Sequence, residues 1–213
     1  MRALDLFCGA GGAGMGLHRA GFDVVGVDLK PQPRYPFEFH EADATTYPIE
    51  GFDFVWASPP CQRFTSLNVL HKKEHPNLIP VTRQRQREAG VFYAIENVPG
   101  APLEAPLMLC GTQFGLATRD GRAELRRHRL FESNIPTLLL TRPCAHRRRS
   151  IGVYGHAGGR SHREKTQQFV TSEWAEAMGI DWMVGSEFVQ AIPPVYSEYV
   201  ARYAADLLTQ ADH

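Results

Sequence analysis

The chain has 213 residues and a formal net charge of zero at pH 7, with 43% hydrophobic and 22% charged residues. This composition is typical of a globular protein, and the length provides one full core with a small insertion but excludes two large domains. No apolar run reaches the roughly 18 residues of a membrane span, and the segment MRALDLFCGA lacks secretory signal features, so we expect an intracellular protein without a membrane partner. The four cysteines lie far apart, which favours reduced thiols over a disulfide framework.

The charge is distributed unevenly along the chain. Residues 119–165 contain 12 Lys and Arg against 4 Asp and Glu, whereas residues 166–213 contain 1 against 7. A basic segment of this kind can meet a phosphate backbone. The alternative is a solvated basic loop that the acidic C-terminal segment neutralises.

Short apolar runs alternate with helical stretches in the first half of the chain. We expect strands at 2–7, 23–28, 38–42, 52–57 and 91–97, and helices near 12–20 and 81–90. Strands that alternate with helices predict an α/β fold with a mostly parallel sheet and helices on both faces. Ligands of such sheets bind beyond the carboxyl ends of the strands.

The first expected strand leads directly into the glycine turn CGAGGAG. Gly9, Gly11 and Gly14 match the pattern G-x-G-x-x-G, and Asp28 ends the second strand 19 residues after Gly9. Glycines allow a ligand close to the backbone, the following helix offers N–H groups, and a carboxylate at this position can bind ribose hydroxyls. The turn predicts a site for a nucleoside-containing cofactor, either NAD or S-adenosylmethionine. A tight glycine turn without a ligand is the alternative.

The fourth expected strand ends in WASPPCQRFT, which places a thiol directly behind two prolines. Pro59 and Pro60 fix φ and remove two N–H donors, so the chain leaves the sheet along a stiff extended path. Cys61 is thereby held at the ligand-binding edge, although an inert buried thiol is the alternative. Glu96 and Asn97 end the next strand and come to the same edge.

Two arginines follow in the segment RRHRLF. Arg127 and Arg129 flank His128, so that both can point to one side of a strand, and residues 113–118 and 127–132 are expected to form a hairpin at the sheet edge. These groups suit a reaction on an electron-poor ring, in which a nucleophile attacks the ring, a carboxylic acid protonates it and a guanidinium holds it. The alternatives are a capping role for Glu96 and a solvated edge for the arginines.

The periodicity breaks down from about residue 133 to 170, in segments rich in Gly, Arg and His. This predicts an insertion or a set of surface loops. Regular structure resumes at 172–179 and in an amphipathic helix from about 194 to 210.

We expect no metal site in this region. Cys144 and His146 are close in sequence, but together with Cys110, His156 or His162 they lack a second close pair of ligands. His128 is interpreted as a sheet-edge residue between two functional arginines.

These motifs together resemble the C5-cytosine DNA methyltransferase family. The matching segments are DLFCGAGG at 5–12, SPPCQ with Phe64 at 58–64, ENV at 96–98 and RRHRLF at 126–131, and VQAIPP at 189–194 is similar to the last motif of the family. They occur in the family's order over nearly the whole chain, which is especially similar to the compact phage-type members.

The resemblance implies a Rossmann-like fold of the S-adenosylmethionine-dependent methyltransferases. It implies a catalytic, cofactor-binding core at residues 1–132, a very small target-recognition region at 133–170, and a return to the core at 171–213. The expected protein is a monomer in the cytoplasm of a bacterial or phage-infected host cell. It either belongs to a restriction-modification system, together with a restriction enzyme, or acts without such a partner.

The resemblance also implies a reaction, in which S-adenosyl-L-methionine methylates C5 of a cytosine flipped out of double-stranded DNA. Cys61 adds to C6, Glu96 hydrogen-bonds N3 and the exocyclic amine, and Arg129 holds O2 of the base. Arg127 braces the Cys61 turn or a phosphate. We expect the nearby guanidinium of Arg129 to lower the pKa of Cys61.

The cofactor contacts follow from the same resemblance. Phe7 meets the adenine, the glycine turn lines the methionine part, Asp28 holds the ribose, and Asp43 meets the adenine amine. The complete predicted set is Phe7, Gly9, Gly11, Gly12, Asp28, Leu29, Asp43, Ala44, Pro60, Gln190 and Ala191.

The residues after the nucleophile resemble the mobile loop that closes over DNA, with an ordinary surface loop as the alternative. DNA contacts are expected from Gln62, Arg63, Thr65, Ser66, Arg147, Arg148, Arg149, Arg160, Arg163 and Lys165. Such a small, cationic set supplies phosphate contacts readily and base contacts sparingly, which predicts a short or relaxed target of about two to four base pairs.

Three features depart from the family pattern. Leu125 stands where the family usually has Gln, two residues before the first arginine of the pair. Val189 and Gln190 stand where the last motif usually has Gly-Asn, near the methionine end of the cofactor. The recognition region has only about 40 residues, much fewer than usual.

Three other functions fit parts of the sequence. QRFT resembles the PPCQ-x-FT of a family branch that methylates tRNA. A catalytically silent DNA-binding or cofactor-sensing relative would not need both Cys61 and Glu96. An NAD-dependent oxidoreductase would leave PPCQ and ENV without a role.

Overall fold

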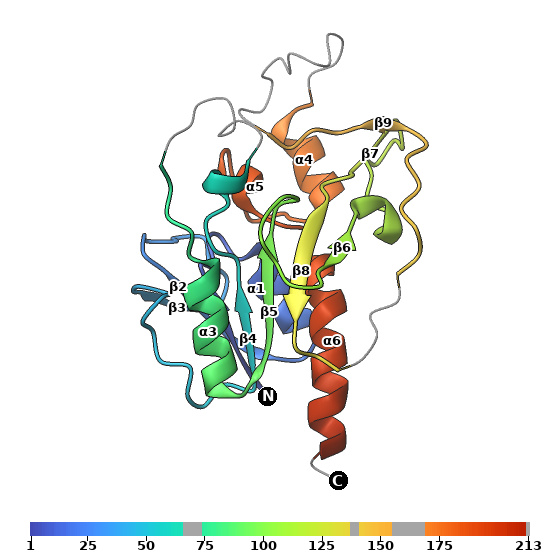
Figure 1. The fold of residues 1–213 in the computed structure, drawn as a ribbon. Helices are drawn as coiled ribbons and strands as arrows, with labels where there is room; N and C mark the ends of the chain where they lie inside the picture. The colour runs from blue at the N-terminus through green and yellow to red at the C-terminus, as the bar shows by residue number, and fades with distance from the viewer. Residues whose placement is uncertain (66–73, 137–140, 155–168, 212–213) are drawn as a thin grey trace.

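The computed structural model describes residues 1–65, 74–136, 141–154 and 169–211. Its main sheet has seven strands in the order β3-β2-β1-β4-β5-β8-β6 (Figure 1). The five parallel strands are β1 (Arg2–Leu6), β2 (Asp23–Asp28), β3 (Glu38–Glu41), β4 (Phe54–Ala57) and β5 (Phe92–Asn97). Strands β6 (Leu107–Leu109) and β8 (Arg129–Ser133) add an antiparallel edge.

Both faces of the central strands are buried, as in other parallel sheets. Ala3 and Trp56 pack on the face that α1 (Gly12–Arg19) and α6 (Pro194–Ala211) cover. Leu4 and Val55 point to the opposite face because successive strand residues alternate, and α3 (Ile79–Ala89) lies on that side (Figure 1). The predicted α/β architecture with helices on both faces is therefore confirmed.

The carboxyl ends of the parallel strands point toward a second, smaller layer of structure (Figure 1). The two-residue strands β7 (Ala123–Glu124) and β9 (Arg149–Ser150) pair there, next to α4 (Thr171–Met178) and α5 (Glu187–Gln190). A separate apolar cluster joins these elements, with Leu125, Ile151 and Trp174 among its buried members. The basic segment therefore contributes to a small core that it shares with α4 and α5, where the sequence predicted an insertion or a set of surface loops over residues 133–170.

The predicted edge hairpin is wrong. Residues 111–114 form the 3-10 turn η2 (Gly111–Phe114) instead of a strand, and β6 replaces them as the partner of β8. Strand β8 begins only at Arg129, so Arg127 and Arg129 do not alternate on one strand. Within the described ranges, no helix has the length and apolar character needed to cross a bilayer.

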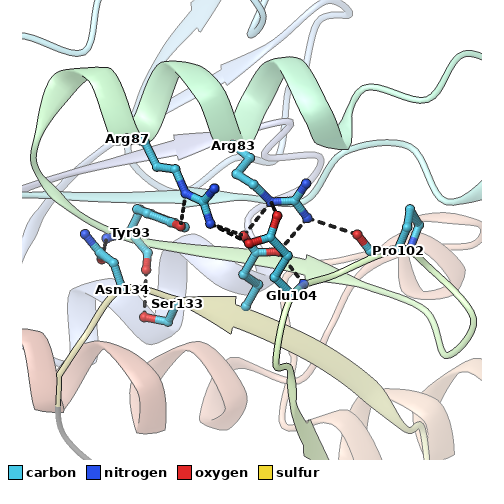
Figure 2. Close-up of polar contacts among 8 residues, drawn as sticks. Arg83, Arg87, Tyr93, Pro102, Glu104, Ser133 and Asn134 are labelled. Carbon is cyan, nitrogen blue, oxygen red and sulfur yellow. Dashed lines mark hydrogen bonds and ion pairs between the residues drawn. The ribbon is translucent and has the colours of Figure 1, made fainter.

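A buried carboxylate fixes α3 to the sheet edge (Figure 2). Glu132 on β8 is 2% exposed and accepts two hydrogen bonds of 2.7 Å from the Arg83 guanidinium. The Glu104 backbone N–H donates to the same carboxylate at 2.8 Å, and Arg87 pairs with the Glu104 side chain at 2.7 Å. Since a bidentate arginine pair specifies geometry as well as charge, this network sets the position of α3.

A second buried carboxylate lies beneath the glycine turn. Asp5 is fully buried and accepts a hydrogen bond from the Tyr35 hydroxyl at 3.1 Å, while its Oδ1 has no hydrogen-bond partner among the described residues. The Tyr35 ring passes so close to Gly14 and Gly26 that a Cβ at either position would lie 2.6 or 2.3 Å from its atoms. Burial raises the pKa of Asp5 to about 7.

Replacement of Glu132 tests the role of the Glu132–Arg83 pair in holding α3 on the sheet. Glu132→Gln removes the buried carboxylate that pairs with the largely buried Arg83 and leaves only the exposed Glu104 carboxylate at 3.4 Å, so we expect the free energy of unfolding to fall by about 3 kcal/mol. Glu104→Gln is the matched control; because the Glu104 side chain is 56% exposed, its loss should cost less than about 1 kcal/mol. Urea unfolding measures both values, and equal effects of the two substitutions would contradict the assignment.

Replacement of Asp5 tests the raised pKa of the buried carboxylate beneath the glycine turn. A raised carboxyl pKa means that the folded state holds a proton that the unfolded chain releases above pH 4, so the stabilisation is lost as pH rises through about 7. Relative to Asp5→Asn, which cannot ionise, the wild-type free energy of unfolding should fall by about 2 kcal/mol between pH 5.5 and pH 8. Parallel urea titrations of the two proteins give this difference, and a difference that is constant with pH would refute the shifted pKa.

Candidate active site

The thiol turn is clamped to the neighbouring strand. Asn97 at the end of β5 donates its side-chain amide to the Pro59 carbonyl at 2.9 Å, and its own oxygen accepts the Val98 N–H at 3.0 Å. Because Pro59 and Pro60 offer no N–H, this carbonyl is the polar group through which the turn can be held. Cys61 then begins the 3-10 turn η1 (Gln62–Phe64) and remains partly exposed. The sequence placed Asn97 at this edge but gave it no role.

Glu96 lies beside the thiol and is paired with Arg129. Glu96 Oε1 is 2.9 Å from Arg129 Nε, and the two residues are 7% and 9% exposed. Ser58 also hydrogen-bonds the Glu96 carboxylate, while its hydroxyl accepts the Trp56 indole N–H at 3.0 Å. Burial outweighs these favourable contacts and raises the pKa of Glu96. The arrangement therefore favours the protonated acid more than an exposed glutamate would.

The pKa of Cys61 is also raised, so the predicted lowering is wrong. Burial is the largest cause and the negative charge of Glu96 the second, and the opposing effects of Arg129 and Arg127 do not overcome them. The prediction assumed a partly exposed thiol near the Arg129 guanidinium, without the burial and the Glu96 charge. In the fold, the same guanidinium is already paired with Glu96, and the carboxylate lies close enough to repel a thiolate.

Arg127 has a different position from the predicted one. Its guanidinium is buried and donates to the carbonyls of Val153 at 3.1 Å and Val189 at 2.7 Å, and to those of Phe188 and Ala191. Burial and the nearby Arg129 charge lower the pKa of Arg127 to about 9. A side chain that is 3% exposed cannot contact a phosphate, and the residues that it braces belong to the last motif and the recognition segment.

Two strained backbone positions lie at this edge. Phe7 has φ of 58° and Arg127 has φ of 28°, both in the left-handed region that residues other than glycine rarely adopt. Phe7 begins the glycine turn and Arg127 lies just before β8. Such conformations persist where the surrounding structure determines them, and they are frequent at functional sites.

The glycine turn forms an open cradle at the ends of β1 and β2. Gly9 has φ of 49°, a Cβ there would point into open space, and its N–H donates to Asp28 Oδ2 at 3.0 Å. Gly11, with φ of 86°, precedes helix α1, and a Cβ at Gly12 would lie 2.6 Å from the Ile192 carbonyl. The cradle thus combines open space beside the half-buried Gly9, a helix N-terminus and a carboxylate, which fits a nucleoside-containing cofactor.

The other predicted cofactor residues differ in exposure. Leu29 is 70% exposed directly after Asp28, and Asp43 is exposed, with Oδ1 accepting the Thr45 N–H and hydroxyl. Ala44 is buried, whereas Pro60, Gln190 and Ala191 are respectively half-buried, exposed and half-buried. The last motif meets the turn at Gly12, where Ala191 Cβ and the Ile192 carbonyl lie next to it. Trp182, which precedes the motif, donates to the Ala10 carbonyl at 2.8 Å.

The predicted DNA-binding residues fall into two described groups. Gln62, Arg63 and Thr65 follow the thiol, and Arg147, Arg148 and Arg149 lie next to or within β9. Glu124 accepts the backbone N–H groups of Arg147 and Arg148, at 3.2 and 3.1 Å, which directs this segment along β7. Ser66, Arg160, Arg163 and Lys165 lie outside the described residues, as does most of the predicted mobile loop.

One departure from the family pattern and one further residue gain a structural explanation. Leu125, in place of the usual Gln, is 1% exposed in the smaller apolar cluster, so it serves as core. His128 lies before β8, with Nε2 3.8 Å from the Cys144 sulfur. Its interpretation as a simple sheet-edge residue is therefore incomplete.

The first half of the chain is similar in sequence to a known protein family. Residues 1–100, which contain the glycine turn, the thiol turn and the end of β5, match the model of the family described as C-5 cytosine-specific DNA methylase. The comparison with curated proteins gives no match.

Three solved structures share the fold over almost their whole length. A DNA modification methyltransferase encoded within an E. coli prophage is 16% identical, with a TM-score of 0.61 over 98% of this chain and 99% of that chain. The Dnmt2 methyltransferase of S. pombe is 14% identical, with a TM-score of 0.53 over 100% and 99%. The Entamoeba histolytica methyltransferase EhMeth is 9% identical, with a TM-score of 0.56 over 98% of both chains.

At these identities the structural similarity concerns the fold alone, and the family model supplies the chemistry. The match covers the cofactor cradle and the clamped thiol, and the fold is the Rossmann-like fold of the methyltransferases. Residues 1–100 are therefore similar to the C-5 cytosine-specific DNA methylase family, and the cofactor that this match indicates is S-adenosyl-L-methionine.

Proposed function

We propose that the protein is a DNA (cytosine-5)-methyltransferase that forms a covalent bond between Cys61 and C6 of a flipped cytosine. The observation that carries this proposal is the arrangement of Cys61, Glu96 and Arg129 at one strand edge, with the thiol turn clamped by Asn97. Stacked duplex DNA cannot present C6 to this edge, so the base must leave the helix at a cost of a few kcal/mol.

Glu96 is suited to act as the acid. Its raised pKa favours the protonated carboxyl, which can donate to N3 of the cytosine ring. Protonation of Glu96 also removes the negative charge that raises the pKa of Cys61. A protonated Glu96 therefore assists twice, because it makes the ring more electrophilic and allows the thiolate to form next to Arg129.

The covalent step uses these two groups together. Cys61 loses its proton to water, its sulfur bonds to C6, and N3 receives the Glu96 proton, which turns C5 into a nucleophilic enamine carbon. Arg129 then balances the Glu96 carboxylate that remains. When bound, S-adenosyl-L-methionine would supply the electrophilic methyl group for C5, with S-adenosyl-L-homocysteine as the leaving product. Loss of the C5 proton to a base or water, return of the N3 proton to Glu96 and departure of Cys61 complete the reaction.

The cofactor is held by the cradle of Gly9, Gly11 and Gly12, with Asp28 on the ribose. Phe7 and Leu29 provide apolar surface for the adenine, and Asp43 keeps one carboxylate oxygen beyond its Thr45 contacts for the adenine amine. Ala44, Pro60, Gln190 and Ala191 complete the predicted set.

DNA is expected to lie across the strand edge and the basic segment that includes Arg147. The recognition region at 133–170 is small, and the cationic residues in its described part sit on an extended segment held by Glu124. We propose that these residues contact phosphates and that few side chains reach base edges.

Methyl transfer to DNA and to tRNA should be compared directly. We expect radiolabelled methyl groups in double-stranded DNA and a loss of at least about 10³-fold in Cys61→Ser, because the substitution removes the nucleophile. Cofactor binding by calorimetry is the control, and it should remain within a few-fold of wild type. DNA containing 5-fluorocytosine should form a covalent adduct that depends on Cys61.

Each alternative function predicts another result in this experiment. Preferential methylation of tRNA would replace the proposed DNA substrate. Cofactor or DNA binding without an adduct or turnover would indicate a silent relative. Full activity of Cys61→Ser would overturn the mechanism.

The small recognition region predicts a short target. After expression in a host without cytosine methylation, sequencing of 5-methylcytosine should reveal a site of about two to four defined base pairs, because each bidentate base contact needs a positioned side chain. The Cys61→Ser strain provides the background. A motif with six defined bases would contradict the prediction.

A further inference from the structure

Four metal-binding side chains gather on the far side of β8 from Glu96. Cys110 follows β6, His128 precedes β8, and Cys144 and His146 belong to the segment that leads into β9. One ligand atom from each residue lies within 4.8 Å of the other three. Cys110 Sγ is 3.4 Å from His146 Nε2, Cys144 Sγ is 3.8 Å from His128 Nε2, and the imidazole centroids are 5.1 Å apart.

This spacing is close to that of a tetrahedral zinc site. Zn–S bonds of about 2.3 Å and Zn–N bonds of about 2.0–2.1 Å place the ligand atoms of a tetrahedron about 3.3–3.8 Å apart. Both measured sulfur–nitrogen distances lie in that range. We propose that Cys110, His128, Cys144 and His146 bind one structural Zn²⁺ ion.

The ligand set selects the metal and its role. Two thiolates and two imidazoles in a tetrahedral arrangement are typical of zinc, whereas the oxygen ligands preferred by magnesium or calcium are absent from this group of four. Four protein ligands fill the coordination shell, so no position remains for water or substrate. The site is therefore structural, and it is separate from the Cys61 chemistry.

Hydrogen bonds around the cluster hold the ligand segments independently of a metal. The Gly111 N–H donates to the Arg126 carbonyl at 2.9 Å, which joins the Cys110 and His128 segments. Gln113 accepts the Cys110 N–H at 2.7 Å and donates to the Arg142 carbonyl at 2.6 Å, which brings the chain before Cys144 toward Cys110. Such surrounding contacts orient ligands and strengthen metal binding.

A second contact fixes the chain after His146. Arg126 donates to the Arg148 carbonyl at 2.7 Å, and Glu124 accepts the Arg147 and Arg148 N–H groups. The two ligands on this segment are thereby placed between two tethered points. The prediction that no metal site exists depended on the lack of a second close pair in sequence, and the fold supplies that pair from Cys110 and His128.

The site would connect recognition to catalysis. His128 lies directly between the buried Arg127 and the catalytic candidate Arg129, whereas Cys144 and His146 precede the basic run 147–149. A bound ion would hold this basic run against the strand that carries Arg129. A very small region that cannot build a large core often needs such a metal cross-link.

Metal analysis of the full-length protein tests the proposal without substrate or cofactor. Protein expressed with zinc and purified under reducing conditions, without chelators, should contain about one zinc per chain by plasma mass spectrometry. Cys144→Ser and His146→Ala should reduce this content to near zero, with at least about a 100-fold weaker apparent zinc affinity. Cys61→Ser and His18→Ala are the controls, since Cys61 and His18 lie outside the cluster, and both should retain the metal.

Cobalt replacement provides a second readout on the wild-type chain. Co²⁺ in this site should give intense tetrahedral d–d bands and thiolate charge-transfer absorption, which zinc then abolishes. This measurement remains decisive if a variant fails to fold. Wild-type protein that neither contains nor takes up stoichiometric zinc, or cobalt spectra without thiolate bands, would overturn the proposal. A Cys110–Cys144 disulfide in freshly purified reduced protein, or equal zinc loss in Cys61→Ser, would overturn it as well.

Discussion

The buried guanidinium of Arg127 connects the recognition segment and the last motif with the strand edge that carries Glu96 and Cys61. It donates to carbonyls of the recognition segment at Val153 and of the last motif at Val189 and Ala191, and to that of Phe188 just before the motif. Its charge also acts on Glu96 and Cys61. Burial of a cation is costly unless dipoles and opposite charges surround it. Although burial lowers its pKa to about 9, Arg127 remains charged at neutral pH. Its strained backbone is therefore part of an arrangement that the surrounding carbonyls determine.

Glu96 and Cys61 form a coupled pair at this edge. Each has a raised pKa, burial is the first cause in both, and the Glu96 charge adds to the shift of the thiol. A site of this kind favours the neutral thiol and the protonated acid, and the thiolate forms more easily beside the protonated acid than beside the carboxylate. Under the proposed function, the raised pKa of the thiol protects Cys61 from unproductive reactions when no cytosine is present.

The local features of the site could be predicted from sequence, but its long-range contacts could not. Strand ends, the glycine turn and the stiffness of Pro59-Pro60 depend on neighbouring residues, and the five parallel strands are confirmed. The position of Arg127 depends on carbonyls 26 to 64 residues away, and the cluster around His128 on residues from three segments. The pKa of Cys61 was predicted in the wrong direction because sequence shows the neighbouring arginine but not the burial.

The small recognition region has few apolar residues with which to fix its backbone. The apolar cluster of Leu125, Ile151 and Trp174 holds β7, β9 and α4 together, but the segment from Cys144 to Arg148 is mostly exposed and contributes little apolar surface. Polar contacts to Glu124 and Arg126 fix its backbone instead. Since a single hydrogen bond contributes only about 1 kcal/mol to stability, these few contacts hold the segment less firmly than an apolar core would. Under the proposed function, a metal cross-link to His128 would keep this segment in register with Arg129 and would help so short a region to position DNA over Cys61.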